Sequence, residues 1–130
     1  MKFLIVEDEF STRLILQNIL NQYGEVHVAV NGREAAQAVK MSLDNKTPYS
    51  LITLDVVMPE MNGQEALKKI RQLENDHDVL HANRARVIMT TSMNNGKSIM
   101  SAFKEQCDGY LVKPIDRSKL ENFVTDLEKI

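Results

Sequence analysis

Five residues whose side chains could do chemistry stand at the ends of short apolar runs in this sequence. They are Glu7, Asp8, Asp55, Thr91 and Lys113. Crowded carboxylates repel one another and raise the pKa of at least one member unless a cation binds among them. Hard carboxylate oxygens suit Mg²⁺, which favours sites that also hold phosphate. The set therefore points to a metal-assisted reaction of a charged group.

Phosphoryl transfer is the reaction that these side chains fit best. It needs mainly positioning and charge neutralisation, which a metal ion, the Lys113 ammonium and a hydroxyl can supply. A carboxylate can itself accept the phosphoryl group and form an aspartyl phosphate. Asp55 lies between the run LITL and two valines, and a charge among apolar neighbours is costly unless it is paired. Asp55 is therefore the best-placed nucleophile.

Alternating strand and helix patterns must position these residues. The predicted strands are short, mostly apolar and β-branched or aromatic, at residues 3–6, 26–30, 51–54, 87–91 and 110–112. Amphipathic helical stretches follow them, with apolar positions at residues 10–19, 35–43, 66–73, 99–107 and 120–127. Residues 74–86 are predicted to form a long polar surface loop or a continuation of the third helix. His27 marks the second strand as an edge strand.

Five strand–helix units in a row predict an α/β fold with a parallel sheet, right-handed crossovers and helices on both faces. In such a sheet all carboxyl ends of the strands lie on one edge, where ligand sites form. Acids, a hydroxyl and an ammonium from four different strands should therefore meet on one rim.

Composition limits the classes of protein that fit. A chain of 130 residues with 43% hydrophobic residues predicts one domain over residues 1–130. A net charge of −2 gives no reason to expect a nucleic-acid partner. The lone cysteine, Cys107, is predicted to be a buried residue of the fourth helix and fits a reducing compartment. No signal peptide or membrane-spanning run is found, so we expect a soluble, cytoplasmic domain with no membrane partner.

Four motifs, in this order, carry a resemblance to a known family. They are LIVEDE at 4–9, LDVVMPEMNG at 54–63, VIMTTS at 87–92 and GYLVKPID at 109–116. Together they resemble the response-regulator receiver domain of two-component signalling, in particular its stand-alone, chemotaxis-regulator type. The resemblance covers essentially the whole chain. It implies a flavodoxin-like (βα)5 fold, doubly wound, with five parallel strands in the order 2-1-3-4-5.

The resemblance also implies roles for the acidic residues. Asp55 would accept a phosphoryl group from a histidine kinase or a histidine phosphotransfer protein. Asp8, Asp55 and the backbone carbonyl of Val57 would bind Mg²⁺, or Mn²⁺ in its place, and Glu7 would act through a metal-bound water. Such a chain assists its own phosphorylation and dephosphorylation and is not a turnover enzyme.

A switch is implied around the same site. Lys113 would pair with the phosphoryl group, and the bond between Lys113 and Pro114 would be cis, which proline permits. Thr91 would move its hydroxyl onto a phosphoryl oxygen, and Tyr110 would turn inward after it. The surface of the fourth helix, fifth strand and fifth helix would then bind an unidentified downstream protein. Thr90 is the alternative switch hydroxyl, although Ser92, a small residue after Thr91, favours Thr91.

Other functions fit the sequence less well. A degenerate receiver that serves only as a constitutive interaction module would not need the intact acid, threonine and lysine set. A phosphatase that forms an aspartyl phosphate usually carries a second acid where this chain has Val57. A flavodoxin needs a hydroxyl- and glycine-rich phosphate loop, where this chain has acids at 7–9. His77 and His81 could bind a metal if helical, but no third ligand is specified, and a solvated loop is expected.

Slow self-hydrolysis of the phosphoaspartate is predicted. Val57 and Met93 stand two residues beyond Asp55 and Thr91, and neither side chain can orient an attacking water by hydrogen bonding. Substituting Val57→Asn together with Met93→Glu should therefore shorten the lifetime of the phosphorylated protein. Phos-tag gels run after removal of the phosphodonor measure that lifetime. A double variant that keeps its phosphoryl group as long as the wild type contradicts the prediction.

Overall fold

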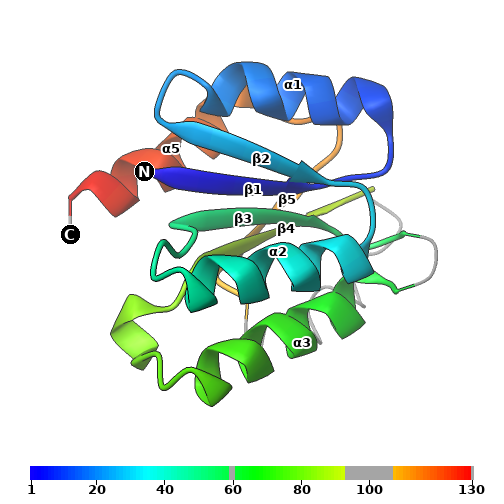
Figure 1. Ribbon diagram of the computed structural model, residues 1–130. Coiled ribbons are helices and arrows are strands. Elements are labelled where there is room, and N and C mark those ends of the chain that lie inside the picture. The colour runs from blue at the N-terminus through cyan, green and yellow to red at the C-terminus, as the bar shows by residue number, and fades with distance from the viewer. Residues whose placement is uncertain (59–60, 93–106, 130) are drawn as a thin grey trace.

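A parallel sheet of five strands in the order β2-β1-β3-β4-β5 forms the centre of the computed structural model (Figure 1). The structure describes residues 1–58, 61–92 and 107–129. The strands are β1 (Lys2–Val6), β2 (Glu25–Ala29), β3 (Leu51–Asp55), β4 (Arg86–Thr91) and β5 (Gly109–Val112). The flavodoxin-like strand order predicted from the sequence is confirmed, and β2 lies at the edge of the sheet as His27 indicated.

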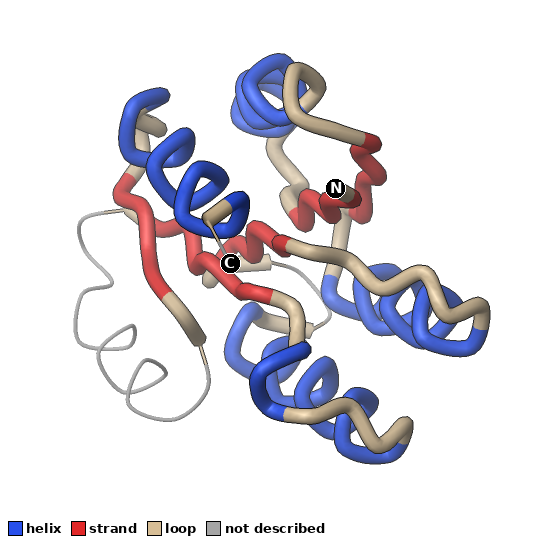
Figure 2. The backbone as a smooth tube through the Cα atoms, turned by 90° about the vertical axis from the view of Figure 1, so that its left-hand side faces the viewer, coloured by secondary structure: helices blue, strands red, loops and turns tan. Residues whose placement is uncertain are grey.

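The described helices cover both faces of the sheet. They are α1 (Phe10–Leu20), α2 (Gly32–Asp44), α3 (Gly63–Asp76), α5 (Arg117–Glu128) and the short 3-10 helix η1 (His81–Asn83). Figure 2, which looks along the strands, shows helices on either side of the sheet. The part of the predicted fourth helix that spans residues 99–106 lies outside the described residues. Cys107 is buried as expected, but it lies in the loop before β5 and not in a helix.

Side-chain alternation divides the core into two layers. Leu4 on β1 pairs in register with Ile52 on β3, and both face the layer under α2 and α3. Their neighbours Phe3 and Leu51 face the opposite layer, under α1 and α5. All four side chains are fully buried. Strands that are covered on both faces must be apolar at successive positions, which explains the nearly continuous apolar runs in the sequence.

Short side chains cap three of the helices. The carboxylate of Asp116 accepts hydrogen bonds from the backbone N–H groups of Ser118 and Lys119 at the start of α5. Asn31 and Asn62 cap α2 and α3 in the same way. Such caps satisfy N–H groups that have no partner within the helix. Each of the three capped helices follows a strand and begins at the carboxyl edge of the sheet.

The connection before β4 differs from a solvated loop at both of its ends. Helix α3 continues to Asp76, and Glu74 and Ala85 are buried. The reason is Arg71, which donates to Glu74 Oε1 at 2.7 Å and to the Ala85 carbonyl at 2.8 Å. Glu74 Oε2 in turn accepts the Ala85 backbone N–H at 2.8 Å. A polar stretch in the sequence thus contributes part of the buried structure.

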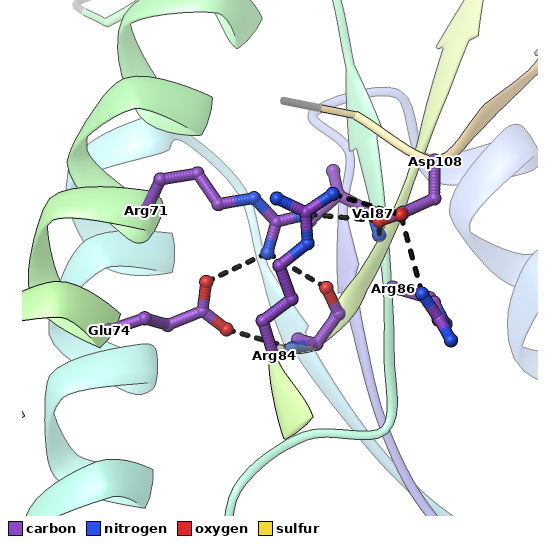
Figure 3. A network of polar contacts seen from close by, with 7 residues as sticks. Arg71, Glu74, Arg84, Arg86, Val87 and Asp108 are labelled. Atoms are coloured by element: carbon purple, nitrogen blue, oxygen red, sulfur yellow. Dashed lines mark hydrogen bonds and ion pairs between the residues drawn. The ribbon is translucent and has the colours of Figure 1, made fainter. Parts of the chain in front are cut away.

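Asp108 joins the same polar network from the start of β5 (Figure 3). Its Oδ2 lies 2.9 Å from Arg71 Nη2 and accepts the Val87 backbone N–H at 2.9 Å. Arg84 and Arg86 lie 3.3 Å and 3.6 Å from its Oδ1. The network therefore ties α3, the start of β4 and the start of β5 together at the amino edge of the sheet.

Within the described ranges no helix is long and apolar enough to cross a membrane.

Removing Arg71 should strongly destabilise the fold. Arg71→Met keeps the apolar stem of the side chain but leaves the buried Glu74 without its cation and removes one of the three arginines around Asp108, which typically costs about 3–5 kcal/mol. Urea denaturation measures the free energy of unfolding. Lys40→Met is the matched control, because it breaks an exposed pair with Asp44 and should cost about 1 kcal/mol or less. Equal losses in the two variants would show that the buried network contributes little.

Candidate functional site

Three carboxylates converge at the carboxyl edge of the sheet. Oxygen atoms of Glu7, Asp8 and Asp55 all lie within 4.8 Å of one another. Glu7 and Asp8 follow β1, and Asp55 ends β3. These two strands pair in parallel with Val6 opposite Leu54, so the residues that come next along each strand meet on the rim. Glu7 and Asp55 are buried, whereas Asp8 is exposed.

Lys113 brings an ammonium group to the acids. Its Nζ lies 2.9 Å from Glu7 Oε1 and 3.3 Å from Asp55 Oδ2. Lys113 follows β5, which β4 separates from β3, so the long side chain reaches across the end of β4. The peptide bond between Lys113 and Pro114 is cis. The ammonium offsets part of the charge that two buried carboxylates would otherwise carry alone.

The pKa values of Glu7 and Lys113 show that burial and neighbouring charges act against each other at this site. Burial raises the pKa of Glu7 to about 7, and neighbouring Asp55 adds to the rise although Lys113 opposes it. Burial lowers the pKa of Lys113, but its contacts with Glu7 and Asp55 outweigh burial, so that the pKa lies above its ordinary value. The site thus favours a cation and disfavours further negative charge.

Two threonines at the end of β4 lie beside the acids. Thr90 is in register with Asp55, and Thr91 with Val112. Both are buried, and the Thr91 hydroxyl donates to the carbonyl of Ser92 at 2.9 Å. The Thr90 hydroxyl has no hydrogen-bond partner among the described residues. Because successive strand residues face opposite sides of a sheet, only one of the two hydroxyls can lie on a given face.

The loop after Asp55 is held close to the strand. The Val57 backbone N–H donates to Asp55 Oδ1 at 3.3 Å, and the Val57 side chain is 63% exposed. Gly63 donates its N–H to the Val56 carbonyl at 2.9 Å. A Cβ at Gly63 would lie 2.3 Å from the Asp55 carbonyl oxygen. Sequence reasoning missed this close approach, for which the glycine that opens α3 was the available signal.

The other residues that the sequence singled out lie away from the three acids, or outside the described residues. Tyr110 lies on β5 and is 47% exposed. Met93 lies outside the described residues. His77 ends α3, where its Nε2 contacts Asp44 Oδ1 at 2.8 Å, whereas His81 is exposed in η1. Burial raises the pKa of Cys107, which disfavours the reactive thiolate.

The three-carboxylate group fits Mg²⁺. The donors are hard oxygens, and the exposed position of Asp8 leaves room for water ligands, which Mg²⁺ usually retains. Burial, together with neighbouring Asp55, raises the pKa of Glu7 although Lys113 opposes the rise, so a further cation at the site would favour the ionised carboxylate. A divalent ion would compensate the carboxylates, and it would also attract a phosphate group to the same rim.

Comparison with known proteins places this arrangement in context. The family model described as response regulator receiver domain matches residues 3–125. A chemotaxis protein CheY homolog of Campylobacter jejuni is 33% identical over 98% of this chain and 92% of its own. The solved structure of Vibrio cholerae chemotaxis protein CheY4 has 27% identity and a TM-score of 0.77, and 97% of each chain is covered.

A plant structure is similar to the chain as well. The receiver domain of the histidine kinase CKI1 from Arabidopsis thaliana, complexed with Mg²⁺ and BeF₃⁻, is 26% identical with a TM-score of 0.75. The match covers 99% of this chain and 90% of that one. The similarity therefore includes a protein whose structure holds Mg²⁺.

Glu7 should make the stability of the metal-free protein depend on pH. Its pKa is about 7 in the folded state against an ordinary 4.5, so the folded state binds more protons between these values. Its contribution to the free energy of unfolding should fall by up to about 3 kcal/mol as the pH rises from 4.5 to 7. Urea denaturation in EDTA from pH 5 to 8 measures this, and Glu7→Gln should lose that part of the slope. Parallel curves for the two proteins would contradict it.

Proposed function

The chain belongs to the family of response regulator receiver domains of two-component signalling, and from this membership we propose that it is a phosphorylation switch whose phosphoacceptor is Asp55. Phosphorylation and Mg²⁺ binding are typical of this family. One observation carries the proposal: the Lys113 ammonium lies between Asp55 and Glu7, beside a third acid, Asp8. The three acids and the ammonium meet at the carboxyl edge of the sheet, where ligands bind in open parallel sheets.

Each residue has a task in phosphoryl transfer. An Asp55 oxygen forms a bond to phosphorus as the bond between phosphorus and the donor histidine nitrogen breaks. Lys113 then shifts from a carboxylate pair toward the phosphoryl oxygens and offsets their charge. Asp8, Asp55 and the Val57 carbonyl would hold Mg²⁺, or Mn²⁺ in its place, with Glu7 acting through water. When bound, the ion neutralises charge on the transferred group.

Phosphorylation would be read out through Thr91 and Tyr110. The Thr91 hydroxyl donates to the Ser92 carbonyl, and a phosphoryl oxygen is a stronger acceptor because it is charged. Moving this hydroxyl to the phosphoryl group would vacate space that the exposed Tyr110 ring can enter. The surface of the predicted fourth helix, β5 and α5 would change as a result. Thr90 would take the same role if its face of β4 turns to the phosphoryl group.

The partners follow from this chemistry. The donor is a histidine kinase or a histidine phosphotransfer protein, and the output is binding to an unidentified downstream protein. We propose no nucleic-acid or membrane partner and no turnover activity. Residues 1–130 act as a single domain, and the lone buried cysteine suits the reducing cytoplasm.

Asp55→Asn should abolish phosphorylation. The amide has nearly the same shape as the carboxylate but is not a nucleophile for phosphorus, so labelling should fall to background, at least about a hundredfold. Phos-tag gels after incubation with acetyl phosphate and Mg²⁺ measure it. Asp8→Asn is the matched control and should label only at raised Mg²⁺ concentration. Equal labelling of Asp55→Asn and wild type sinks the assignment, and no labelling of the wild type favours a constitutive interaction module.

A further inference from the structure

We infer that Arg13 is a positioning residue that holds the acidic turn between β1 and α1 in the shape that binds the metal ion. The acidic turn is defined as residues 7–9, which carry Glu7 and Asp8. Arg13 lies in the first turns of α1 and belongs to none of the motifs that indicate the phosphorylation site. The inference rests on the proposed function, because it concerns the Mg²⁺ affinity of that same site.

The Arg13 guanidinium contacts two consecutive carbonyl groups of the acidic turn. Its Nη1 donates to the carbonyl oxygen of Glu7 at 3.1 Å and reaches that of Asp8 at 3.5 Å. Its backbone N–H donates to the carbonyl oxygen of Glu9 at 3.0 Å. The guanidinium therefore contacts the peptide carbonyls of the two residues that carry the site carboxylates, Glu7 and Asp8, whereas the bond to Glu9 is the first backbone hydrogen bond of α1. These contacts fix the direction of the backbone from which the side chains of Glu7 and Asp8 extend toward Asp55.

The acidic turn needs such a restraint because its side chains repel one another. Glu7 and Asp8 are neighbours in the chain, and both have carboxylate oxygens within 4.8 Å of Asp55. Without a restraint, this repulsion favours backbone conformations that turn Asp8 away into solvent. A charged hydrogen bond to a carbonyl oxygen is stronger than a neutral one, so the guanidinium can oppose that change.

The guanidinium is itself oriented by Phe10. Arg13 Cζ lies 5.5 Å from the centre of the Phe10 ring, although Phe10 is 67% exposed. A cation over an aromatic face is attracted to it, by about 0.5–1 kcal/mol at exposed sites. The contact limits the freedom of the Arg13 side chain and keeps Nη1 at the turn.

Positioning and simple electrostatics predict opposite effects for the loss of Arg13. A positive charge close to the site repels Mg²⁺, so that removing the charge should by itself tighten metal binding. If Arg13 holds the acidic turn, removing it should weaken metal binding, because the carboxylates are no longer arranged in advance. The sign of the change in Mg²⁺ affinity therefore separates the two effects.

Isothermal titration calorimetry with Mg²⁺ on the whole chain tests the inference. Arg13→Met, which keeps the stem and removes the donors, should raise the Kd for Mg²⁺ by about fivefold or more. Arg13→Lys keeps the charge but not the planar fork of donors, and it should also raise the Kd. Arg33→Met is the matched control, since it removes an exposed arginine from the start of α2 at the same edge of the sheet. Its Kd should be unchanged or slightly lower.

The outcomes separate the inference from the proposed function. An unchanged or lower Kd in both Arg13 variants overturns the inference while the proposed metal site stands. A wild type that binds no Mg²⁺, or binds it equally well after Asp8→Asn, overturns the metal site itself. Urea denaturation in EDTA checks that each variant is folded, and Arg13→Lys decides the question if Arg13→Met is not. A rise in Kd for Arg33→Met equal to that for Arg13→Met would show that the effect does not depend on the contacts of Arg13 with the acidic turn, and it would overturn the inference.

Discussion

The crowding of negative charge at the carboxyl edge of the sheet is the constraint on which the rest of the structure depends. Glu7 is fully buried, lies beside Asp55, and has a pKa of about 7. A buried carboxylate of this kind is tolerated when cations compensate it or when it takes up a proton. Lys113 supplies one cation, and the site favours a second. Phosphorylation of Asp55 would add more negative charge to this site. Even a small movement of the surrounding side chains would then change the free energy of the protein considerably.

Strand β5 transmits this constraint, because ion pairs hold both of its ends. Asp108, just before the strand, is held by Arg71 at the amino edge of the sheet. Lys113, just after it, contacts Glu7 and Asp55 at the carboxyl edge. A strand of four residues fixed in this way has little freedom to slip in register. The exposed residue Tyr110 lies on β5 between the two ion pairs. A movement of Lys113 would therefore affect its position directly.

Much of the fold and the site could be predicted from the sequence, because the signals are local. Apolar runs of four or five residues identified the strands, and polar residues after them identified the rim that gathers Asp8, Asp55 and Lys113. The buried Arg71 and Glu74 could not be predicted, since charged residues on a polar stretch normally indicate solvent. Their pairing depends on Asp108, which is distant in the sequence. The role assigned to Arg13 was missed as well, because an arginine on a helix normally points to solvent and its carbonyl contacts leave no mark in the sequence.

The spatial strand order was implied by the family resemblance. By itself, the sequence determined the order of the strands and helices along the chain and the residue types at the rim. These depend on periodicity and on the general rule that parallel strands end on one edge. Only the tertiary structure decided how the charges are paired: Lys113 with Glu7 as well as Asp55, and Arg71 with both Glu74 and Asp108. Pairing depends on distances of a few ångströms between side chains from different elements. Such distances are set by packing and strand register, which no local pattern encodes.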